Sequence, residues 1–280
     1  MTGTEFKNSK IYPNAELRDL VAYYWQIETT SNFKGQEISV PDGYVNLLFT
    51  FNPVLRDQQV LKPDIYIIGP RNRKSDYSFS NSETCSFGVC LVPTALKRLF
   101  GINISTLKNQ ALELREIDKR SCFDHGQFQE KMRIEDKIEL VNRYLVTKDN
   151  HYNDRQIASI INRIFYDPNL QSVKAICSNY KLTAKQLYRN FTAVTGLSPV
   201  EFIRISRMNK FFHYYQQEAD YLTSACYSAG YYDQSHFIKE FKKIIGCSPT
   251  QLFSTESQLL RILSSDIDKN ISHLSSYSAN

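Results

Sequence analysis

Two short stretches in the second half of the chain each gather hydrogen-bond donors at helical spacing. The first cluster combines basic, amide and hydroxyl side chains: Lys185, Gln186, Tyr188, Arg189 and Thr192. The second has the same character: Gln234, Ser235, His236, Lys239, Lys242 and Lys243. Arg and Lys can bond O6 and N7 of guanine, and Gln can bond N6 and N7 of adenine. Acidic residues are nearly absent from both faces, with Glu240 the exception, so we expect both to read DNA.

A solvated helix face, with Lys kept for solubility, is the alternative for any one of these residues. Two related clusters in one chain favour DNA over that alternative. Net charge agrees, because residues 155–253 hold 12 Lys and Arg against 6 Asp and Glu and leave the rest of the chain near neutral. A basic domain joined to a near-neutral one is typical of a protein that meets a polyanion.

The elements that must position the first cluster are two helices and a short turn. Ser172 can cap a helix whose apolar face is Val173, Ile176, Cys177 and Tyr180. After the turn, Thr183 can cap a second helix that Gly196 ends. The inward residues of that second helix are Leu187, Phe191 and Val194.

The second cluster has the same scaffold. Its first helix presents Leu222, Ala225, Cys226 and Ala229, and Gly230 lies at the turn. Asp233 can then cap a helix that turns Phe237, Phe241 and Ile244 inward and ends at Gly246. We call the helices after Thr183 and after Asp233 the reading helices.

The two scaffolds are copies of one unit. Six positions recur at an offset of 50 residues, from Thr183, Leu187, Phe191, Gly196, Ser198 and Pro199 to Asp233, Phe237, Phe241, Gly246, Ser248 and Pro249. Before the turn the offset is 49, as in Cys177 and Cys226, so the second turn holds one extra residue. This spacing predicts a tandem helix-turn-helix.

A long helix is predicted between the two units, from Pro199 to about Glu218, with an apolar face of Phe202, Ile205, Met208, Phe212 and Tyr215. Its length of roughly 30 Å is close to the ~34 Å between successive major grooves on one face of DNA. One chain could therefore place both reading helices in adjacent grooves without a dimer partner.

Residues 155–253 resemble the DNA-binding domain of the AraC/XylS family of bacterial transcription regulators. The match is strongest over 230–243 (GYYDQSHFIKEFKK) and 246–249 (GCSP), and looser over 187–191 (LYRNF) and 196–199 (GLSP). Two departures are Ala225-Cys226, where the family usually has Ile-Ala, and Lys181, where Gly is common.

The resemblance implies double-stranded promoter DNA as a partner, RNA polymerase as a second one, and neither catalysis nor a cofactor. It implies that Lys185, Tyr188 and Arg189 contact bases or backbone from the first unit. From the second unit it implies the same for Gln234, Ser235, His236 and Lys239. A small-molecule effector and a homodimer are left open.

The first 120 residues are predicted to be strand-rich. Strands are expected at Tyr44–Phe51, Ile65–Ile68 and Ser86–Val92, and a helix at Ala95–Phe100 closed by Gly101. The spacing of Leu17, Leu20, Val21 and Tyr24 predicts one more helix. The region resembles, less specifically, an uncharacterised sensor-like domain of some AraC-type regulators, through Pro41-Asp42-Gly43, Ile68-Gly69-Pro70 and the strand before Pro93. An effector-binding or regulatory role is implied, with any pocket lined by aromatic and aliphatic residues.

Residues 121–153 are predicted to connect the domains. Ile134, Ile138, Val141 and Leu145 recur along a charged helix, which is either a short dimer seam or a connecting helix that rests on one domain. We expect an α+β chain: a strand-rich domain at 1–120, a connection at 121–153, the all-α tandem domain at 154–255, and a polar tail at 256–280.

Composition excludes other classes. Hydrophobic residues make up 42% of the 280 residues and charged residues 22%, which is a globular balance. There is no apolar run long enough to span a membrane and no secretory signal, so we expect a cytoplasmic protein without membrane contact. The six cysteines form no Cys-x-x-Cys pair and are expected to be buried thiols.

Phosphate-loop, Gly-x-Ser-x-Gly, His-Glu-x-x-His and Rossmann motifs are absent, so no enzyme is expected. The competing interpretation is an interaction or sensor protein whose helical domain has lost specific DNA binding.

Overall fold

The structure is a computed structural model that describes residues 6–30, 35–79, 83–119, 123–152, 154–217 and 222–254. It divides into two compact units. The first contains Met1–Glu37, Tyr44–Pro70 and Asp76–Asn153, and the second contains Ile38–Gly43, Arg71–Ser75 and Asp154–Asn280. Cys122 and the predicted tail at 256–280 lie outside the described residues.

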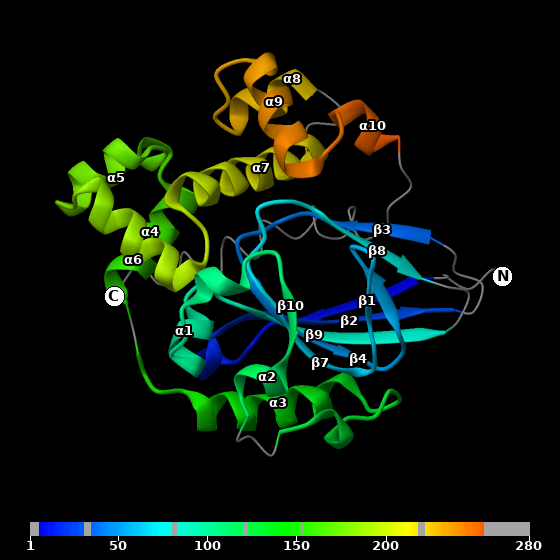
Figure 1. Cartoon of the computed structure of the whole chain (residues 1–280). Coiled ribbons are helices and arrows are strands. Elements are labelled where there is room, and N and C mark those ends of the chain that lie inside the picture. Colours follow the sequence, from blue (N-terminus) through cyan, green and yellow to red (C-terminus); the bar gives the residue numbers. More distant parts are fainter. Residues whose placement is uncertain are drawn as a thin grey trace. The chain divides into compact units, whose positions relative to one another are not determined.

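The first unit is built on a six-stranded antiparallel sheet in the order β1-β2-β9-β4-β7-β10 (Figure 1). In chain order the strands are β1 (Phe6–Ile11), β2 (Val21–Thr29), β4 (Val45–Thr50), β7 (Asp64–Ile68), β9 (Thr84–Leu91) and β10 (Ala111–Glu113). The three strands expected from the sequence are therefore confirmed as β4, β7 and β9.

A second sheet has the order β3-β8-β5-β6. Its strands are β3 (Gly35–Ser39), β5 (Val54–Arg56), β6 (Gln59–Leu61) and β8 (Ser75–Phe79). With two sheets and only short helices before residue 120, the N-terminal half is strand-rich, as expected.

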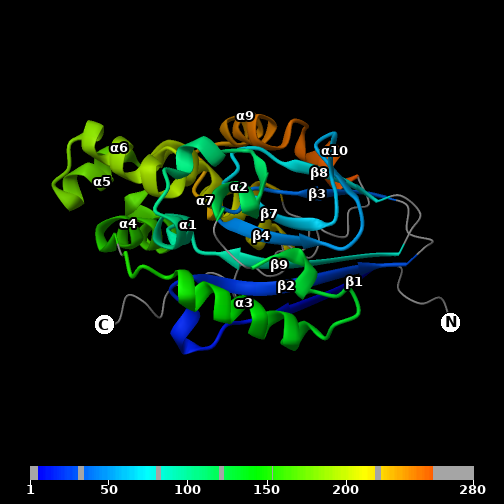
Figure 2. The same cartoon turned by 60° about the horizontal axis from the view of Figure 1, so that its bottom comes forward.

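One face of the large sheet is covered by helix α3 (Ile134–Lys148), which runs along β2 in Figure 2. The hydroxyl of Tyr24 on β2 donates to Asn142 Oδ1, and Lys137 Nζ donates to Gln26 Oε1 at 2.9 Å. Val141 and Leu145 are fully buried. Because these two seam candidates pack inside the first unit, the structure favours a connecting helix that rests on one domain over a dimer seam.

The opposite face of the same sheet carries Trp25, the single tryptophan of the chain. Its indole lies against Gly88 on the neighbouring strand β9, where an added Cβ would come within 2.1 Å of the ring. Trp25 Nε1 also donates to Asn46 Oδ1 at 3.1 Å. A glycine is therefore required here by close approach, and the indole reaches across β9 to a side chain of β4.

The remaining elements of the first unit are short. They are the helices α1 (Ala95–Phe100) and α2 (Leu114–Ile117) and three 3₁₀ turns, at Ala15–Leu17, Ile104–Leu107 and His125–Gln127. Gly101 closes α1 with φ of +67°, as the sequence predicted.

The helix predicted from Leu17 to Tyr24 is wrong. Only a 3₁₀ turn forms at Ala15–Leu17, capped by Asn14, and the chain enters β2 at Val21. The apolar residues of the pattern are buried, but pairing with β1 and β9 on both sides overrides their helical spacing.

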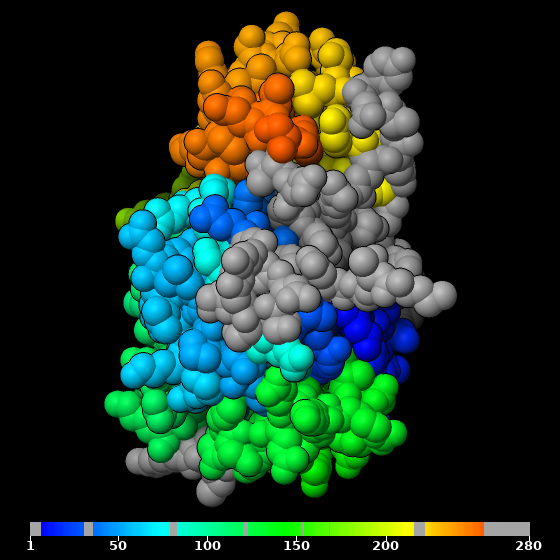
Figure 3. Space-filling model, turned by 90° about the vertical axis from the view of Figure 1, so that its right-hand side faces the viewer, coloured from blue at the N-terminus to red at the C-terminus, as the bar shows by residue number. Residues whose placement is uncertain are grey.

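The second unit is helical from Arg155 onward within its described residues. Its helices are α4 (Arg155–Tyr166), α5 (Val173–Tyr180), α6 (Ala184–Thr195), α7 (Pro199–Gln217), α8 (Leu222–Ser228), α9 (Gln234–Ile245) and α10 (Pro249–Phe253), with a 3₁₀ turn at Pro168–Leu170. In Figure 1, α7 runs from the α5–α6 pair to the α8–α9 pair. The α8 and α9 surfaces adjoin in the space-filling view, yellow beside orange (Figure 3). The tandem arrangement is confirmed.

Two short segments from the N-terminal half, 38–43 and 71–75, also belong to this unit. Ile38 and Val40 are buried in one apolar cluster with Phe211 and Phe241. The backbone N–H of Lys74 donates to the carbonyl oxygen of Ile244 at 2.9 Å. The end of α9 is therefore held by a segment far from it in sequence.

Candidate nucleic-acid interface

The first reading helix, α6, begins and ends as its sequence predicts. Thr183 Oγ1 accepts from the N–H of Gln186 at 3.2 Å, and Gly196 ends the helix with φ of +72°. Leu187 and Phe191 are fully buried. With the apolar face fixed inward, the remaining faces of α6 are turned to solvent.

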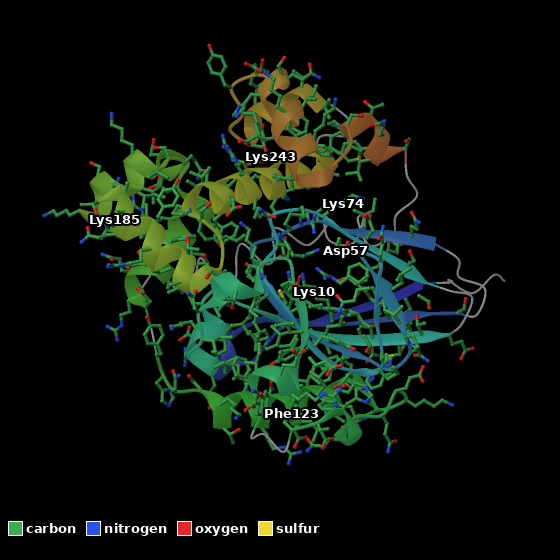
Figure 4. All side chains as sticks on the ribbon, in the orientation of Figure 1. Lys10, Asp57, Lys74, Phe123, Lys185 and Lys243 are labelled. Atoms are coloured by element: carbon green, nitrogen blue, oxygen red, sulfur yellow. The ribbon has the colours of Figure 1, made fainter. Side chains whose placement is uncertain are left out.

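Four residues of the first cluster lie in solvent on α6, and the fifth, Thr192, is half-buried. Lys185, Gln186, Tyr188 and Arg189 are exposed, and Lys185 projects from α6 in Figure 4. Arg189 Nε donates to Asn190 Oδ1 at 3.2 Å, a contact with a half-buried neighbour that a guanine could replace. Gln186 has a structural partner as well, because its Oε1 accepts from the N–H of Thr183 at 2.9 Å in a capping box.

The second reading helix, α9, is built in the same way. Asp233 Oδ1 accepts from the N–H of His236 at 2.7 Å, and Gly246 ends the helix with φ of +84°. Phe237 and Phe241 are fully buried. The cap, the buried pair and the terminal glycine thus recur in both units.

Most predicted DNA-contacting residues of α9 are exposed as well: Gln234, Ser235, Lys239, Lys242 and Lys243. Lys243 is labelled on α9 in Figure 4. His236 differs, because it is half-buried and its Nε2 lies 3.6 Å from Glu240 Oε1, while its ring contacts that of Tyr231. The structure therefore places five of the six on the open side of α9 and gives the sixth an internal partner.

Glu240 does not belong to the exposed face, which corrects the expectation from sequence. It is 8% exposed, and its Oε1 accepts from Arg204 Nε at 3.0 Å and from Arg207 Nη2 at 3.2 Å. Both arginines are on α7, and Arg207 also lies over the Tyr231 ring. Glu240 therefore anchors α9 to α7. Because its carboxylate is buried, the exposed face of α9 is more uniformly basic than the sequence suggested.

Sequence reasoning missed this anchor. Arg204 and Arg207 are spaced i, i+3 inside the apolar pattern of α7, which was the one available signal. Charged residues that interrupt a buried stripe need a partner. Their partner comes from another helix, 33 to 36 residues further along the chain, and spacing within α7 cannot identify it.

The connecting helix α7 joins the two reading units through continuous packing. It has 19 residues, about 28 Å. Four residues of its predicted apolar face are buried: Phe202, Ile205, Met208 and Phe212. The Phe202 ring contacts Phe191 of α6 at 5.4 Å between centroids, and Phe211 contacts Phe237 of α9 at 4.3 Å. Each reading helix is therefore packed directly on α7.

Three further observations concern metal ligands, membrane-spanning helices and a buried thiol. No group of three or more His, Cys, Asp and Glu residues that could hold a metal ion occurs among the described residues. Within the same ranges no helix has both the length and the apolar character needed to cross a membrane. Burial raises the pKa of Cys226 to about 12, so this thiol is a protonated packing residue rather than a nucleophile.

Two family models match the chain. Residues 176–255 match a helix-turn-helix domain, and residues 9–113 match a domain of unknown function, DUF6597. The helix-turn-helix match covers α5 to α10 from Ile176 onward, and so contains both reading helices.

One curated relative is similar to part of the chain. The chain is 30% identical over 81 residues to the HTH-type transcriptional activator RhaS of Escherichia fergusonii. The alignment spans 29% of this chain and 29% of RhaS. The chain therefore covers less than a third of the length of this relative.

Among solved structures, ToxT of Vibrio cholerae is similar over most of the chain. One ToxT structure has a TM-score of 0.49 at 11% identity and covers 91% of this chain and 100% of ToxT. Another, bound to (E)-4-(8-methylnaphthalen-1-yl)but-3-enoic acid, has a TM-score of 0.45 at 12% identity over 93% of this chain and 100% of ToxT.

Proposed function

Because the chain belongs to the AraC/XylS family of regulators through its tandem helix-turn-helix domain, we propose that it is a DNA-binding transcription regulator that inserts α6 and α9 into adjacent major grooves. The observation that carries the proposal is the repeat of one exposed, donor-rich reading helix at each end of α7. A monomer suffices for this mode, because both reading helices are in one chain.

The length of α7 supports binding to one face of the duplex. Its ~28 Å compares with ~34 Å between successive major grooves, and the reading helices add width at both ends. Packing of Phe202 on Phe191 and of Phe211 on Phe237 makes the spacing rigid. A rigid spacer lowers the entropic cost of placing the second helix once the first is bound.

Within this interface we assign different tasks to different residues. Arg189 and Gln234 read bases, since both lie in the exposed N-terminal half of a reading helix. Lys242 and Lys243 hold phosphate, because they come two turns or more after the cap of α9, where a helix inserted by its N-terminal end leaves the groove. Lys185, Gln186, Tyr188, Ser235, His236 and Lys239 complete the contact surface.

A binding experiment over a salt series tests the proposal. The duplexes are a site selected by the wild-type chain from a random pool and a scrambled duplex of the same length. Binding by the wild type should weaken steeply as salt rises, through release of counterions. Arg189→Ala should cost ~1–3 kcal/mol on the selected site and relax preference at one position. Lys242→Ala should weaken both duplexes alike and reduce the salt slope by about one.

The outcomes separate the proposal from its alternatives. A wild-type chain that binds neither duplex at low salt would make this an interaction or sensor protein instead. Equal weakening of both duplexes by Arg189→Ala, or an effect of Lys242→Ala on the selected site alone, would reverse the two assignments.

The N-terminal half is proposed to modulate DNA binding. Segments 38–43 and 71–75 support this, because they are part of the DNA-binding unit while the strands that flank them continue into the first unit. Lys74 bonds the last turn of α9 directly. Leu48, Tyr66 and Ile68 are buried in one apolar cluster of the large sheet, and the partly buried Trp25 packs against it. These four side chains are the proposed lining for a small-molecule effector. Action in the bacterial cytoplasm, with RNA polymerase as a partner, follows from this proposed role.

A further inference from the structure

The extra residue of the second turn can be identified by superimposing the hydrogen bonds of the two turns. Lys181 and Gly230 are equivalent, since each follows its helix in the left-handed region, with φ of +51° and +84°. The next residues are equivalent as well: the N–H of Leu182 donates to Cys177 O, and that of Tyr231 donates to Cys226 O, both at 3.1 Å. The caps Thr183 and Asp233 then follow, so the residue without a counterpart is Tyr232.

Tyr232 is the most exposed large hydrophobic side chain in the described part of the protein, at 87%. Its neighbour Tyr231 is 3% exposed and packs beside Phe237. Among the described residues Tyr232 has no hydrogen bond, ion pair or ring contact. The Tyr232 ring therefore makes no contact with the described residues that would stabilise the second unit. The first unit closes its turn without an equivalent residue, so the turn itself does not require one.

The position of Tyr232 is at the end of α9 that approaches DNA. It directly precedes the cap Asp233, and exposed Gln234 follows. The Asp233 carboxylate bonds the His236 N–H and puts a negative charge at the start of the helix. That charge disfavours a phosphate bound at the bare helix end, so a backbone contact at this edge of the groove needs a neutral donor on a longer side chain. A tyrosine hydroxyl is such a donor.

We propose that Tyr232 is a DNA-binding residue found in the second unit alone, with its hydroxyl donating to a backbone phosphate and its ring against the adjoining deoxyribose. The inference rests on the proposed function. It makes the two units unequal: the second fixes the register of the protein on the duplex with a contact that the first cannot make.

The test compares Tyr232→Phe, Tyr232→Ala and the control Tyr227→Ala in the full chain. Tyr227 is a tyrosine of the same unit, 59% exposed on α8, outside α9 and its turn. We expect Tyr232→Phe to weaken binding about 3- to 10-fold and Tyr232→Ala about 10-fold or more, equally on the selected and the scrambled duplex. Tyr227→Ala should bind like the wild type, and thermal unfolding should be unchanged for all three.

Each other outcome is decisive. Failure of the wild type to bind either duplex defeats the proposed function, whereas wild-type binding with unimpaired Tyr232→Ala defeats only this inference. Loss confined to the selected duplex would make Tyr232 a base-reading residue and overturn the phosphate assignment. Equal weakening by Tyr227→Ala, or wild-type binding by Tyr232→Phe, would overturn the contact through the hydroxyl.

Discussion

The two helix-turn-helix units of this chain share the ends of their reading helices and differ in how those helices are held. Both begin at a side-chain cap, Thr183 or Asp233, and both end at a glycine with positive φ, Gly196 or Gly246. The first unit is fastened to α7 by apolar packing, of Phe191 on Phe202. The second adds ion pairs to its packing. The two copies of the helix-turn-helix unit are therefore attached to α7 by different kinds of contact.

The difference in attachment comes down to one pair of equivalent positions. Asn190 of α6 corresponds to Glu240 of α9 at the offset of 50. Asn190 Oδ1 accepts a hydrogen bond from Arg189 on its own helix. Glu240 instead bonds two arginines of α7. The second unit thus has a polar contact that fixes its angle on the connecting helix, and the first relies on shape.

The largest effect is expected from Glu240→Ala. It leaves Arg204 and Arg207 without their carboxylate, and because both arginines keep some access to water the cost is about 2 kcal/mol rather than the larger value for a fully buried pair. Native-state hydrogen exchange should report this as roughly 30-fold faster exchange of α9 amides. The matched variant Asn190→Ala should leave α6 exchange nearly unchanged. Comparable effects of the two substitutions would remove the distinction in attachment.

Glu240 also marks the limit of what the sequence could predict for the site. Caps, terminal glycines and inward phenylalanines are set by residues within one helix of each other, and these predictions are confirmed. Whether Glu240 faces solvent depends on arginines of another helix. The position of a residue on a helix gives only the direction of its side chain. For Glu240 that direction suggested solvent, whereas the carboxylate is buried against α7.

The N-terminal half shows the same limit in a different form. Gly101 and the strands around Val45–Thr50 and Asp64–Ile68 were predictable, because turn residues and β-branched runs act locally. Residues 17–24 have helical spacing and yet form a turn and a strand, since the ladders to β1 and β9 come from distant parts of the chain. Strand order depends on such distant pairing, and the sequence pattern does not contain it.

The two turns are expected to differ in their response to substitution, and Gly230→Ala should destabilise the second. Gly230 has φ of +84°, and an added Cβ would meet nothing within 4 Å. The cost is therefore conformational and not steric, ~1–2 kcal/mol for a left-handed residue with a side chain. Thermal unfolding and exchange of α8 and α9 amides should both show the loss, while α5 and α6 amides stay unchanged. Stability equal to the wild type would mean that the second turn relaxes into another conformation.

The reciprocal substitution, Lys181→Gly, has the smallest expected effect and the opposite sign. Lys181 occupies the same left-handed position at φ of +51°, where a residue with a Cβ is strained and glycine is not. Glycine should stabilise the first unit by about 0.5–1 kcal/mol and slow exchange of α5 and α6 amides accordingly. Lys181→Ala separates this gain from the lost charge, because alanine keeps the strain and removes the ammonium. If both variants were equally stabilised, charge repulsion in the basic first unit would be the cause. If neither were, Lys181 would not be strained in the first turn.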